Sequence, residues 1–473
     1  MNTVRGGARW FAAARLGMQA AQFAVGLILA RLLAPEDFGL FASVSVIVSF
    51  GVVIFEGGLH SALVHAKEPE DRDYSTVFWT NALGGILLAG LVWGLAPWIA
   101  DFFGEPVLLD LAPLVGLTFA VHLGLVHDVI LRRQSRYRAS ALVPGLAMVF
   151  GLVVTLVLAF AGAGVFALAI GPLAAQAVSS ISYFIVCGWR PRSFISLAAL
   201  RGLLPYAVPL VGANIVDYWG KNADNLLIGR FLGAAQLGFY NRAYNLVLLP
   251  LNQVLLAAGG AVSPALARMR EEPARLVAAY RRSFRGVAVI SVPVMAGLAV
   301  VAPGAVPLLW GPQWVASVPL LQLLSIAGIP QVLTLTTSWL YQARDRTGTM
   351  FRVALLWNGL GIVGMVVGLQ WGAAGVAAAV LARYWIGLPF ELAAAVRGVP
   401  VTVGRLLMDA AIPTLAAVVM AGLTWLLPAV TGWEREEGWV ALIQILVGAA
   451  AYILALALMR RESLREVLTL VKP

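Results

Sequence analysis

Charged side chains are scarce in this sequence. Asp, Glu, Lys and Arg supply 12% of its 473 residues, which is about half the share found in ordinary soluble domains. Apolar residues supply 60%, and the mean hydropathy is +0.87. A soluble chain of this length keeps a polar exterior, because its core cannot absorb so much apolar surface. The composition therefore excludes an ordinary soluble protein and predicts a chain that lies in a lipid bilayer.

Cysteine and histidine are too few to build the sites they usually build. The single cysteine, Cys187, excludes a disulfide within the chain and a cysteine-built metal site. The four histidines lack ligand spacing on one helix face, and we expect structural roles for His60, His65, His122 and His127. Phosphate-cradling glycine loops, zinc-binding helices and nucleophile elbows are also absent. The sequence thus predicts a protein that is not an enzyme and that needs no metal or cofactor.

Fourteen apolar stretches are long enough, at about twenty residues each, to cross the hydrocarbon core of a bilayer. They are continuous rather than alternating, which predicts α-helices and not the strands of a barrel. The predicted spans are 11–33, 38–64, 75–101, 107–130, 139–161, 164–187, 203–232, 237–267, 286–310, 315–342, 348–369, 372–396, 405–428 and 438–459.

The basic residues alternate along the loops between these spans. All but six of the 33 lysines and arginines lie in the terminal segments, in the even-numbered connections or at the span ends beside them. The exceptions are Arg31, Lys221, Arg230, Arg242, Arg383 and Arg435. Because cytoplasmic loops carry an excess of lysine and arginine, this pattern predicts two cytoplasmic termini in a bacterial inner membrane. The net charge of +10 is spread over these loops, which argues against nucleic acid as a partner.

An internal repeat relates two parts of the chain. ILARLLAPEDFGLF (28–41) and LIGRFLGAAQLGFY (227–240) align at an offset of 199 residues, which pairs Gly39 with Gly238. Chance similarity among apolar helices is the alternative, since their restricted alphabet produces many matches. A second pair in the same order favours the repeat.

The second pair of segments lies further along each half. FGEPVLLDLAPL (103–114) and WGPQWVASVPLL (310–321) align at an offset of 207 residues, which pairs Gly104 with Gly311. Both offsets correspond to six spans, an even number, so both halves keep the same orientation in the membrane.

We therefore predict an all-α membrane fold with two six-helix lobes. The lobes are residues 1–200 and 201–400, related by a pseudo-two-fold axis along the membrane normal. Residues 401–473 add two further spans and a cytoplasmic tail. Lobes arranged in this way are expected of proteins that work by alternating access.

Polar side chains inside the spans mark the candidate site, because an ionisable group there costs at least a few kcal/mol unless it pairs or faces water. In the seventh span such residues recur at spacings of three and four and so share a stripe. The residues predicted to line a hydrated, partly cationic cavity are Arg15, Gln19, Gln22 and Glu56 from the first two spans, Asn214, Asp217, Lys221, Asp224 and Asn225 from the seventh, Asn241, Arg242, Asn245 and Asn252 from the eighth, and Arg383 from the twelfth.

Helix packing is the alternative to a cavity. Asp217, Lys221 and Asp224 could neutralise one another while they lock helices together. Glu56 and Arg15 lie in the cytoplasmic halves of neighbouring spans, where a pair between them could be a gate or a purely structural contact.

Two further carboxylates lie near the ends of later spans. Arg383 and Glu391 share one side of the twelfth span, but eight residues separate them and predict no direct contact without bending. Asp409 begins the thirteenth span and is predicted to offset the charge of Arg405 or Arg397.

Five segments resemble a known family. RLLAPEDFGLFA (31–42) followed by FEGGLHSALV (55–64) resembles the opening of the Wzx polysaccharide flippases, which belong to the multidrug/oligosaccharidyl-lipid/polysaccharide exporter superfamily. LRRQSRYR (131–138), NADNLLIGRFLGAAQLGFYNRAYNL (222–246) and LLWGPQWVASVPLLQLLSIAG (308–328) are similar to later segments of that family. The resemblance covers the whole chain and is nearest to the branch of colanic-acid and succinoglycan exporters.

The resemblance implies a flippase for surface polysaccharide, either lipopolysaccharide or exopolysaccharide. Its expected substrate is an undecaprenyl-pyrophosphate-linked oligosaccharide, carried from the cytoplasmic to the periplasmic leaflet. We expect Arg15, Lys221 and Arg242 to bind the diphosphate, and the asparagines of the eighth span to bind sugar. The expected partners are membrane lipid, a polysaccharide polymerase and a chain-length regulator. With no nucleotide-binding domain in the sequence, H⁺ or Na⁺ is a candidate coupling ion.

Two other functions compete with this one. A multidrug/cation antiporter of the same superfamily usually has twelve spans and an acidic cavity, whereas this chain has fourteen spans and basic candidates. A membrane polysaccharide polymerase or glycosyltransferase needs a large periplasmic loop, and the longest predicted here, near Pro428 to Glu437, is short.

Overall fold

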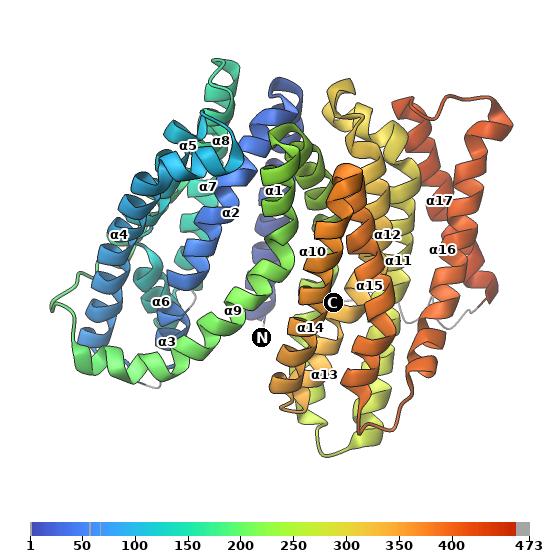
Figure 1. Cartoon of the computed structure of the whole chain (residues 1–473). Coiled ribbons are helices and arrows are strands. Elements are labelled where there is room, and N and C mark those ends of the chain that lie inside the picture. Colours follow the sequence, from blue (N-terminus) through green and yellow to red (C-terminus); the bar gives the residue numbers. More distant parts are fainter. Residues whose placement is uncertain (1, 56–57, 67, 460–473) are drawn as a thin grey trace. The chain divides into compact units, whose positions relative to one another are not determined.

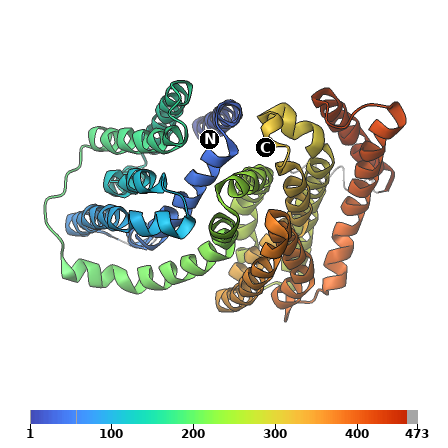
Figure 2. The ribbon, with the colours of Figure 1, turned by 45° about the horizontal axis from the view of Figure 1, so that its top comes forward.

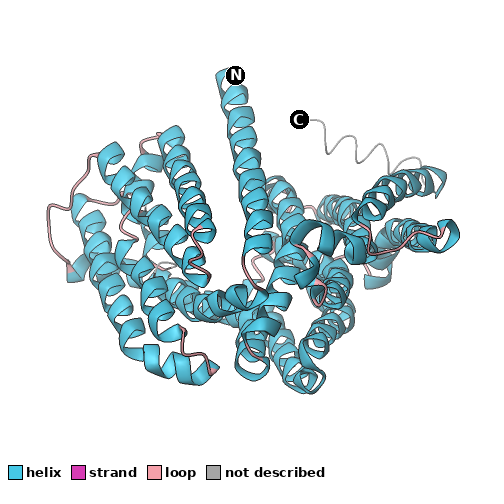
Figure 3. Cartoon of the chain, turned by 90° about the horizontal axis from the view of Figure 1, so that it is seen from above, coloured by secondary structure: helices cyan, strands magenta, loops and turns pink. Residues whose placement is uncertain are grey.

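The computed structural model describes residues 2–55, 58–66 and 68–459, and the side chains of all of these except 2–16, 55, 255–258, 260 and 261. Every regular element in this described part is a helix, and short loops join most of them (Figure 3). The helices are α1 (Asn2–Leu32), α2 (Pro35–Phe55), α3 (Leu59–His65), α4 (Asp71–Phe103), α5 (Leu108–Val121), α6 (Leu125–Arg133), α7 (Tyr137–Phe160), α8 (Val165–Cys187), α9 (Leu197–Leu232), α10 (Ala234–Arg268), α11 (Pro273–Trp310), η1 (Pro312–Trp314), α12 (Ser317–Leu335), α13 (Thr337–Ala343), α14 (Thr347–Gly368), η2 (Leu369–Trp371), α15 (Gly372–Val396), α16 (Val403–Thr431) and α17 (Gly438–Met459).

The helices account for all fourteen predicted spans. Within the described residues, eleven stretches are long and apolar enough to cross a membrane, and one of these, Thr347–Val396, contains both α14 and α15. The first span ends in the shorter apolar helix Gly17–Leu32, and the eighth lies in α10, which is 35 residues long. Spans two, four and ten each consist of two consecutive helices. The all-α fold and its span count are confirmed.

The chain forms two compact units, of which the first ends at Gly238 and the second begins at Phe239. The division falls inside α10, so that single helix continues from one unit into the other. The first unit includes α9, which packs on α2, α3 and α4. The lobe boundary expected at residue 200 stays a prediction.

The helix α9 follows a bent course. Pro205 and Pro209 lie in its first half, and each removes a backbone hydrogen bond that would keep the helix straight. Figures 1 and 2 show the first half of α9 crossing one end of the first unit before the second half turns along α2. The second half carries the polar stripe, so the bend sets the direction of the candidate site.

The two segments of the first repeat meet in the first unit. A Cβ atom on Gly39 would overlap the carbonyl oxygen of Ala234, and a Cβ atom on Gly238 would overlap that of Pro35. Pro35 and Ala234 are themselves 199 residues apart, so the same contact is made twice with the roles exchanged. Such reciprocity is the property of a two-fold axis. The packing therefore supports the repeat, and it explains why both positions need glycine.

The second repeat is visible in backbone conformation. Gly104 follows α4 with a φ of 73°, and Gly311 follows α11 with a φ of 100°. Residues other than glycine rarely adopt positive φ values, and glycine commonly ends helices in this way. The matched glycines thus end matched helices in the two units.

Two arginines tie α16 to α11 in the second unit. Asp409 on α16 accepts hydrogen bonds from Arg281 Nε at 2.6 Å and Nη2 at 2.9 Å, and from Arg285 Nη2 at 3.1 Å. The prediction that Asp409 offsets Arg405 or Arg397 was wrong. Asp409 is buried and turned toward α11, so its partners come from the helix it packs on and not from its own.

Candidate functional site

An exposed charge pair marks the second half of α9. Lys221 Nζ lies 2.8 Å from Asp217 Oδ2, one helical turn earlier, and both side chains are more than half exposed. The two residues are therefore paired, as the packing alternative predicts, but they are not enclosed between helices. A charge pair exposed on a membrane-spanning helix is costly against lipid, so this face of α9 suits contact with water or with a polar ligand.

The remaining polar residues of the α9 stripe lie in different surroundings. Asn214 is half-buried, whereas Asp224 and Asn225 are 3% and 6% exposed. Asp224 Oδ1 accepts the backbone N–H of Asn225 at 2.8 Å. The stripe thus runs from an accessible part at Asp217 and Lys221 to a buried part at Asp224 and Asn225, and only the accessible part is placed to meet a ligand.

Aromatic side chains flank the accessible part of the stripe. The Tyr218 hydroxyl donates to the carbonyl oxygen of Val46 on α2. The Phe50 ring lies 5.7 Å from that of Tyr218 and 5.0 Å from that of Trp219. Aromatic faces beside amides and charges are common in binding pockets for small molecules. The pattern of polar residues alone did not predict this group, although Tyr218 and Trp219 stand between Asp217 and Lys221 in the sequence.

The asparagines of α10 form part of the second unit. Asn245 Nδ2 donates to Asn241 Oδ1 at 2.7 Å, which joins two of the predicted sugar-binding amides. Asn245 and Asn252 are exposed. Arg242, predicted to bind an anion, lies with its guanidinium 5.4 Å from the centre of the Trp310 ring.

The candidates of the first two spans are only partly described. Gln19 is half-buried and Gln22 is exposed on α1. The Arg15 side chain and the whole of Glu56 lie outside the described residues. The predicted contact between them stays a prediction.

Arg383 lies in a buried polar cluster between α13, α14 and α15. Its Nη2 donates to Asn358 Oδ1 at 3.1 Å, and its guanidinium carbon lies 4.0 Å from the centre of the Tyr384 ring. The same Nη2 is 3.5 Å from Glu391 Oε1. The prediction that Arg383 and Glu391 are too far apart for contact was wrong, because both side chains extend along the helix toward each other across Gly387, which has no side chain to block them.

Another buried carboxylate, Asp128 on α6, joins α6 to α7 and α8 in the first unit. Its Oδ1 accepts hydrogen bonds from the Ser140 hydroxyl and, at 3.2 Å, from the Tyr183 hydroxyl. Its Oδ2 lies 2.7 Å from Arg132 Nε. His127, next to it, is fully buried and within 3.3 Å of the Trp189 carbonyl. These contacts are structural, and the structural role expected for His127 agrees with them.

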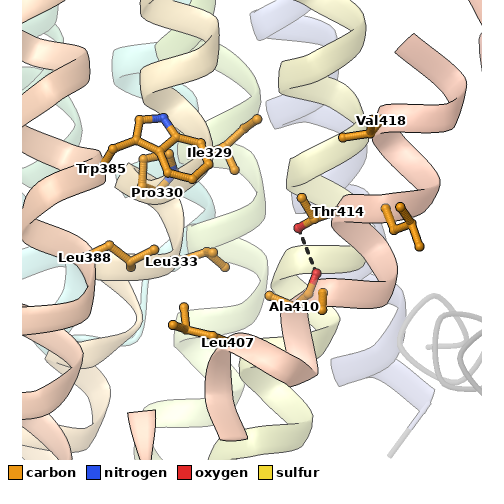
Figure 4. Close-up of a pocket in the computed structure, with 11 residues that line it drawn as sticks. Ile329, Pro330, Leu333, Trp385, Leu388, Leu407, Ala410, Thr414 and Val418 are labelled. Atoms are coloured by element: carbon orange, nitrogen blue, oxygen red, sulfur yellow. Dashed lines mark hydrogen bonds between the residues drawn. The ribbon is translucent and has the colours of Figure 1, made fainter. Parts of the chain in front are cut away.

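An apolar groove of about 460 Å³ runs between α12, α15 and α16 in the second unit (Figure 4). Residues of all three helices line it, among them Leu333, Trp385, Leu388, Leu407, Thr414 and Val418. The one hydroxyl drawn there, on Thr414, donates to the carbonyl of Ala410 in its own helix at 2.8 Å. The groove therefore offers almost no hydrogen bonding and suits a hydrocarbon chain.

Metal ligands do not gather anywhere in the described residues. No group of three or more His, Cys, Asp or Glu side chains there could hold a metal ion.

Sequence comparisons connect the chain to proteins of polysaccharide synthesis. Residues 28–319 match the family model described as polysaccharide biosynthesis protein. The lipopolysaccharide biosynthesis protein WzxC of Escherichia coli is 28% identical over 381 residues, which cover 78% of this chain and 76% of that protein. The succinoglycan biosynthesis transport protein ExoT of Rhizobium meliloti is 28% identical over 327 residues, covering 69% and 66%.

Solved structures share the fold at lower sequence identity. The lipid II flippase MurJ, in an inward closed conformation, matches with a TM-score of 0.75 and 18% identity, over 96% of this chain and 99% of that one. A multidrug resistance MATE family transporter in an inward-facing conformation matches with a TM-score of 0.64 and 15% identity, over 83% and 96%. At these identities the likeness concerns the fold alone.

Proposed function

The chain belongs to the family of polysaccharide biosynthesis proteins, and on that basis we propose that it is a flippase for a lipid-linked oligosaccharide. Its substrate class is an oligosaccharide repeat unit on undecaprenyl pyrophosphate, moved from the cytoplasmic to the periplasmic leaflet by alternating access. The relatives supply the class, since one is named for lipopolysaccharide biosynthesis and one for succinoglycan transport.

The observation that carries the proposal is the exposed pair of Asp217 and Lys221 on α9. A diphosphate crossing the membrane needs cations that are already accessible and hydrated, because a bare ion in hydrocarbon is prohibitively costly. Lys221 can exchange its bond to Asp217 for one to a phosphate oxygen. The amides of Asn241, Asn245 and Asn252 supply donors and acceptors for sugar hydroxyls.

The hydrocarbon tail has different needs from the head group. It gains nothing from a polar lining and can remain in lipid or follow the apolar groove beside α16. A substrate with an ionic head and a long apolar tail therefore fits a protein that offers both surfaces.

The orientation proposed for the chain follows its loop charges. Both termini are cytoplasmic and the membrane is the bacterial inner membrane, because the basic loops then face the cytoplasm. Cysteine scanning of loop positions such as Glu68 and Glu436, with a membrane-impermeant reagent, tests this. Labelling of position 68 from outside the cell would contradict it.

Deletion of the gene tests the function directly. We expect lipid-linked repeat units to accumulate in the cytoplasmic leaflet and surface polysaccharide to disappear. Unchanged pools and unchanged surface polymer, in a strain with no second export route, would contradict the proposal.

The Lys221→Met variant tests the role of the exposed pair of Asp217 and Lys221. It keeps the aliphatic stem and removes the charge, so we expect export to fall at least tenfold with an unchanged level of protein in the membrane. Arg201→Met is the matched control, because Arg201 is also exposed on α9 but lies near the start of the helix, far from the pair. A loss of protein level in Lys221→Met, in place of a loss of export, would favour a packing role.

The antiporter alternative makes the opposite prediction about charge. A cationic drug would be drawn to Asp217, so Asp217→Asn would abolish drug resistance while surface polysaccharide remained normal. The flippase predicts no resistance phenotype in either variant.

A further inference from the structure

The buried cluster around Arg383 contains polar atoms for which the described part of the chain provides no hydrogen-bond partner. Glu391 Oε1, Arg383 Nη1 and the Tyr341 hydroxyl are each buried without a hydrogen-bond partner. Tyr341 is 2% exposed and Glu391 is 7% exposed. Buried polar groups in folded proteins are normally hydrogen-bonded, and a concentration of exceptions in one place calls for a specific explanation.

Of the two partners in this ion pair, Arg383 is the more firmly held. Arg383 is held independently of Glu391, by Asn358 Oδ1 at 3.1 Å and by the face of the Tyr384 ring. Glu391 lies 3.5 Å from Arg383 without the geometry of a hydrogen bond, and among the described residues its Oε1 has no hydrogen-bond partner. The arginine can therefore keep its place when the carboxylate changes its charge.

Glycines provide the space in which the two side chains meet. A Cβ atom on Gly387 would lie 3.1 Å from Glu391 Oε1 and 3.2 Å from the Trp357 ring. A Cβ atom on Gly361 would lie 3.2 Å from Arg383 Cγ. Glu391 Oε1 and the Arg383 stem are thus closely packed on the sides of these two glycines. A proton needs no cavity.

We propose that Glu391 is a proton-binding site of the second unit. In one state the carboxylate pairs with Arg383 and the pair is neutral. In the other state the carboxylate takes one proton from water and becomes the neutral acid, so that the cluster carries the single positive charge of Arg383. The O–H formed is a donor, which the carboxylate lacks.

The titratable groups around Glu391 are few. The elements packed against α15 are α12, α13, α14, α16 and η2. Tyr341 is the titratable side chain of α13. The helices α12 and η2 carry no ionisable side chain, α14 carries the exposed Arg352, and α16 carries Arg405 and the fully paired Asp409. The protonation step therefore concerns one carboxylate and one guanidinium.

Asp128 in the first unit is a buried carboxylate that we do not expect to bind a proton. It accepts two side-chain hydrogen bonds and one ion pair, so its charge is satisfied on both oxygens. Asp128 is accordingly the matched control for Glu391.

The role of this proton in export rests on the flippase function proposed above. A proton bound at Glu391 adds charge to the second unit, so proton entry from the periplasm and release to the cytoplasm can drive a cycle of conformations. Proton binding itself does not depend on the substrate and is measured separately.

Infrared difference spectroscopy of the full-length protein in lipid bilayers tests the proposal. As the pH is lowered, the wild type should gain a carboxylic C=O band that Glu391→Gln lacks and that Asp128→Asn keeps. The subtraction isolates one carboxyl group among 23 Asp and Glu residues. An identical acid titration of the wild type and Glu391→Gln would overturn the proposal.

Arg383→Gln provides a second variant in case Glu391→Gln fails to fold. Without its counter-ion Glu391 should stay protonated across the whole range, so the pH-dependent band should be lost and a constant band should replace it. A band that titrates as in the wild type would show that the pair is no switch and would overturn the proposal.

The two proposals fail in different ways. If the flippase function is wrong, gene deletion leaves the lipid-linked pools unchanged. The infrared band of Glu391 is still seen in the wild-type protein in bilayers. If the proton site is wrong, deletion still causes accumulation while the band is the same in the wild type and Glu391→Gln.

Discussion

Two segments of the chain, 28–41 and 227–240, are alike in sequence and contact each other, yet the helices that lead into them differ. The shared positions include Gly39 and Gly238, whose backbones meet, and both segments are well packed. The helices before them are α1, with Gln22 at one position, and α9, with Lys221 at the equivalent one 199 residues later. The repeat has kept the glycines that pack and changed residues of the polar stripe that we propose to face the substrate.

This difference separates two kinds of polar or small residue that look alike in a sequence. A glycine at the contact has a steric reason to remain in both copies. The lysine in the α9 stripe is Lys221, and the equivalent residue of α1 is Gln22. A contact made in both copies therefore does not account for the lysine. Substitutions that act on the shared positions should therefore cost stability, and those that act on the differing positions should cost transport.

The largest expected effect comes from Gly238→Ala. Its Cβ would overlap the Pro35 carbonyl, which is backbone and cannot turn aside, so two helices must separate. We expect the free energy of unfolding to fall by about 3 kcal/mol, the upper range for overpacking. Size-exclusion chromatography after graded heating measures this loss of stability as a lower temperature at which half of the folded protein is lost. Gly90→Ala is the control, because nothing lies within 4 Å of a Cβ there.

Gly39→Ala should cost a similar amount, because it makes the same contact with the roles exchanged. Combined with Gly238→Ala, it should add less than its own single effect, since one separation of the helices relieves both clashes. The same heating series measures the double variant. Fully additive losses would show that the two contacts are independent, and would contradict the inference that the two segments form one reciprocal contact.

A smaller effect is expected at Arg230, which is matched to Arg31 in the repeat. Its guanidinium lies 5.4 Å from the centre of the Phe102 ring and 5.7 Å from that of Phe231. We expect Arg230→Gln to lower the free energy of unfolding by about 0.5–1 kcal/mol, the usual value of an exposed cation–π contact. A wild-type heating curve combined with lost export would instead assign Arg230 to the substrate.

The smallest effect on stability is expected from Lys221→Gln, which gives α9 the residue found at the equivalent place in α1. The pair with Asp217 is more than half exposed on both sides, and such pairs contribute about 0.5 kcal/mol or less. Export should nevertheless fall as in Lys221→Met. A large loss of stability here would mean that position 221 packs like the shared positions.

The carboxylates show where prediction from sequence stops. The sequence placed Arg383, Glu391 and Asp409 in or beside their spans, and all three lie there. It did not identify their partners. Asp409 bonds to Arg281 and not to a neighbour in its own helix, and this choice depends on which helix α16 packs against.

The spans, their helical nature and their order were determined by the sequence alone, because hydrophobic length and loop charge act locally along the chain. The repeat was also readable, since matched residues recur at a fixed offset. The tertiary structure decided which atoms meet. It brought Gly39 and Gly238 onto each other's backbone, and it closed the distance between Arg383 and Glu391 across Gly387. Contacts of this kind depend on packing and side-chain direction over many residues, and no local pattern encodes them.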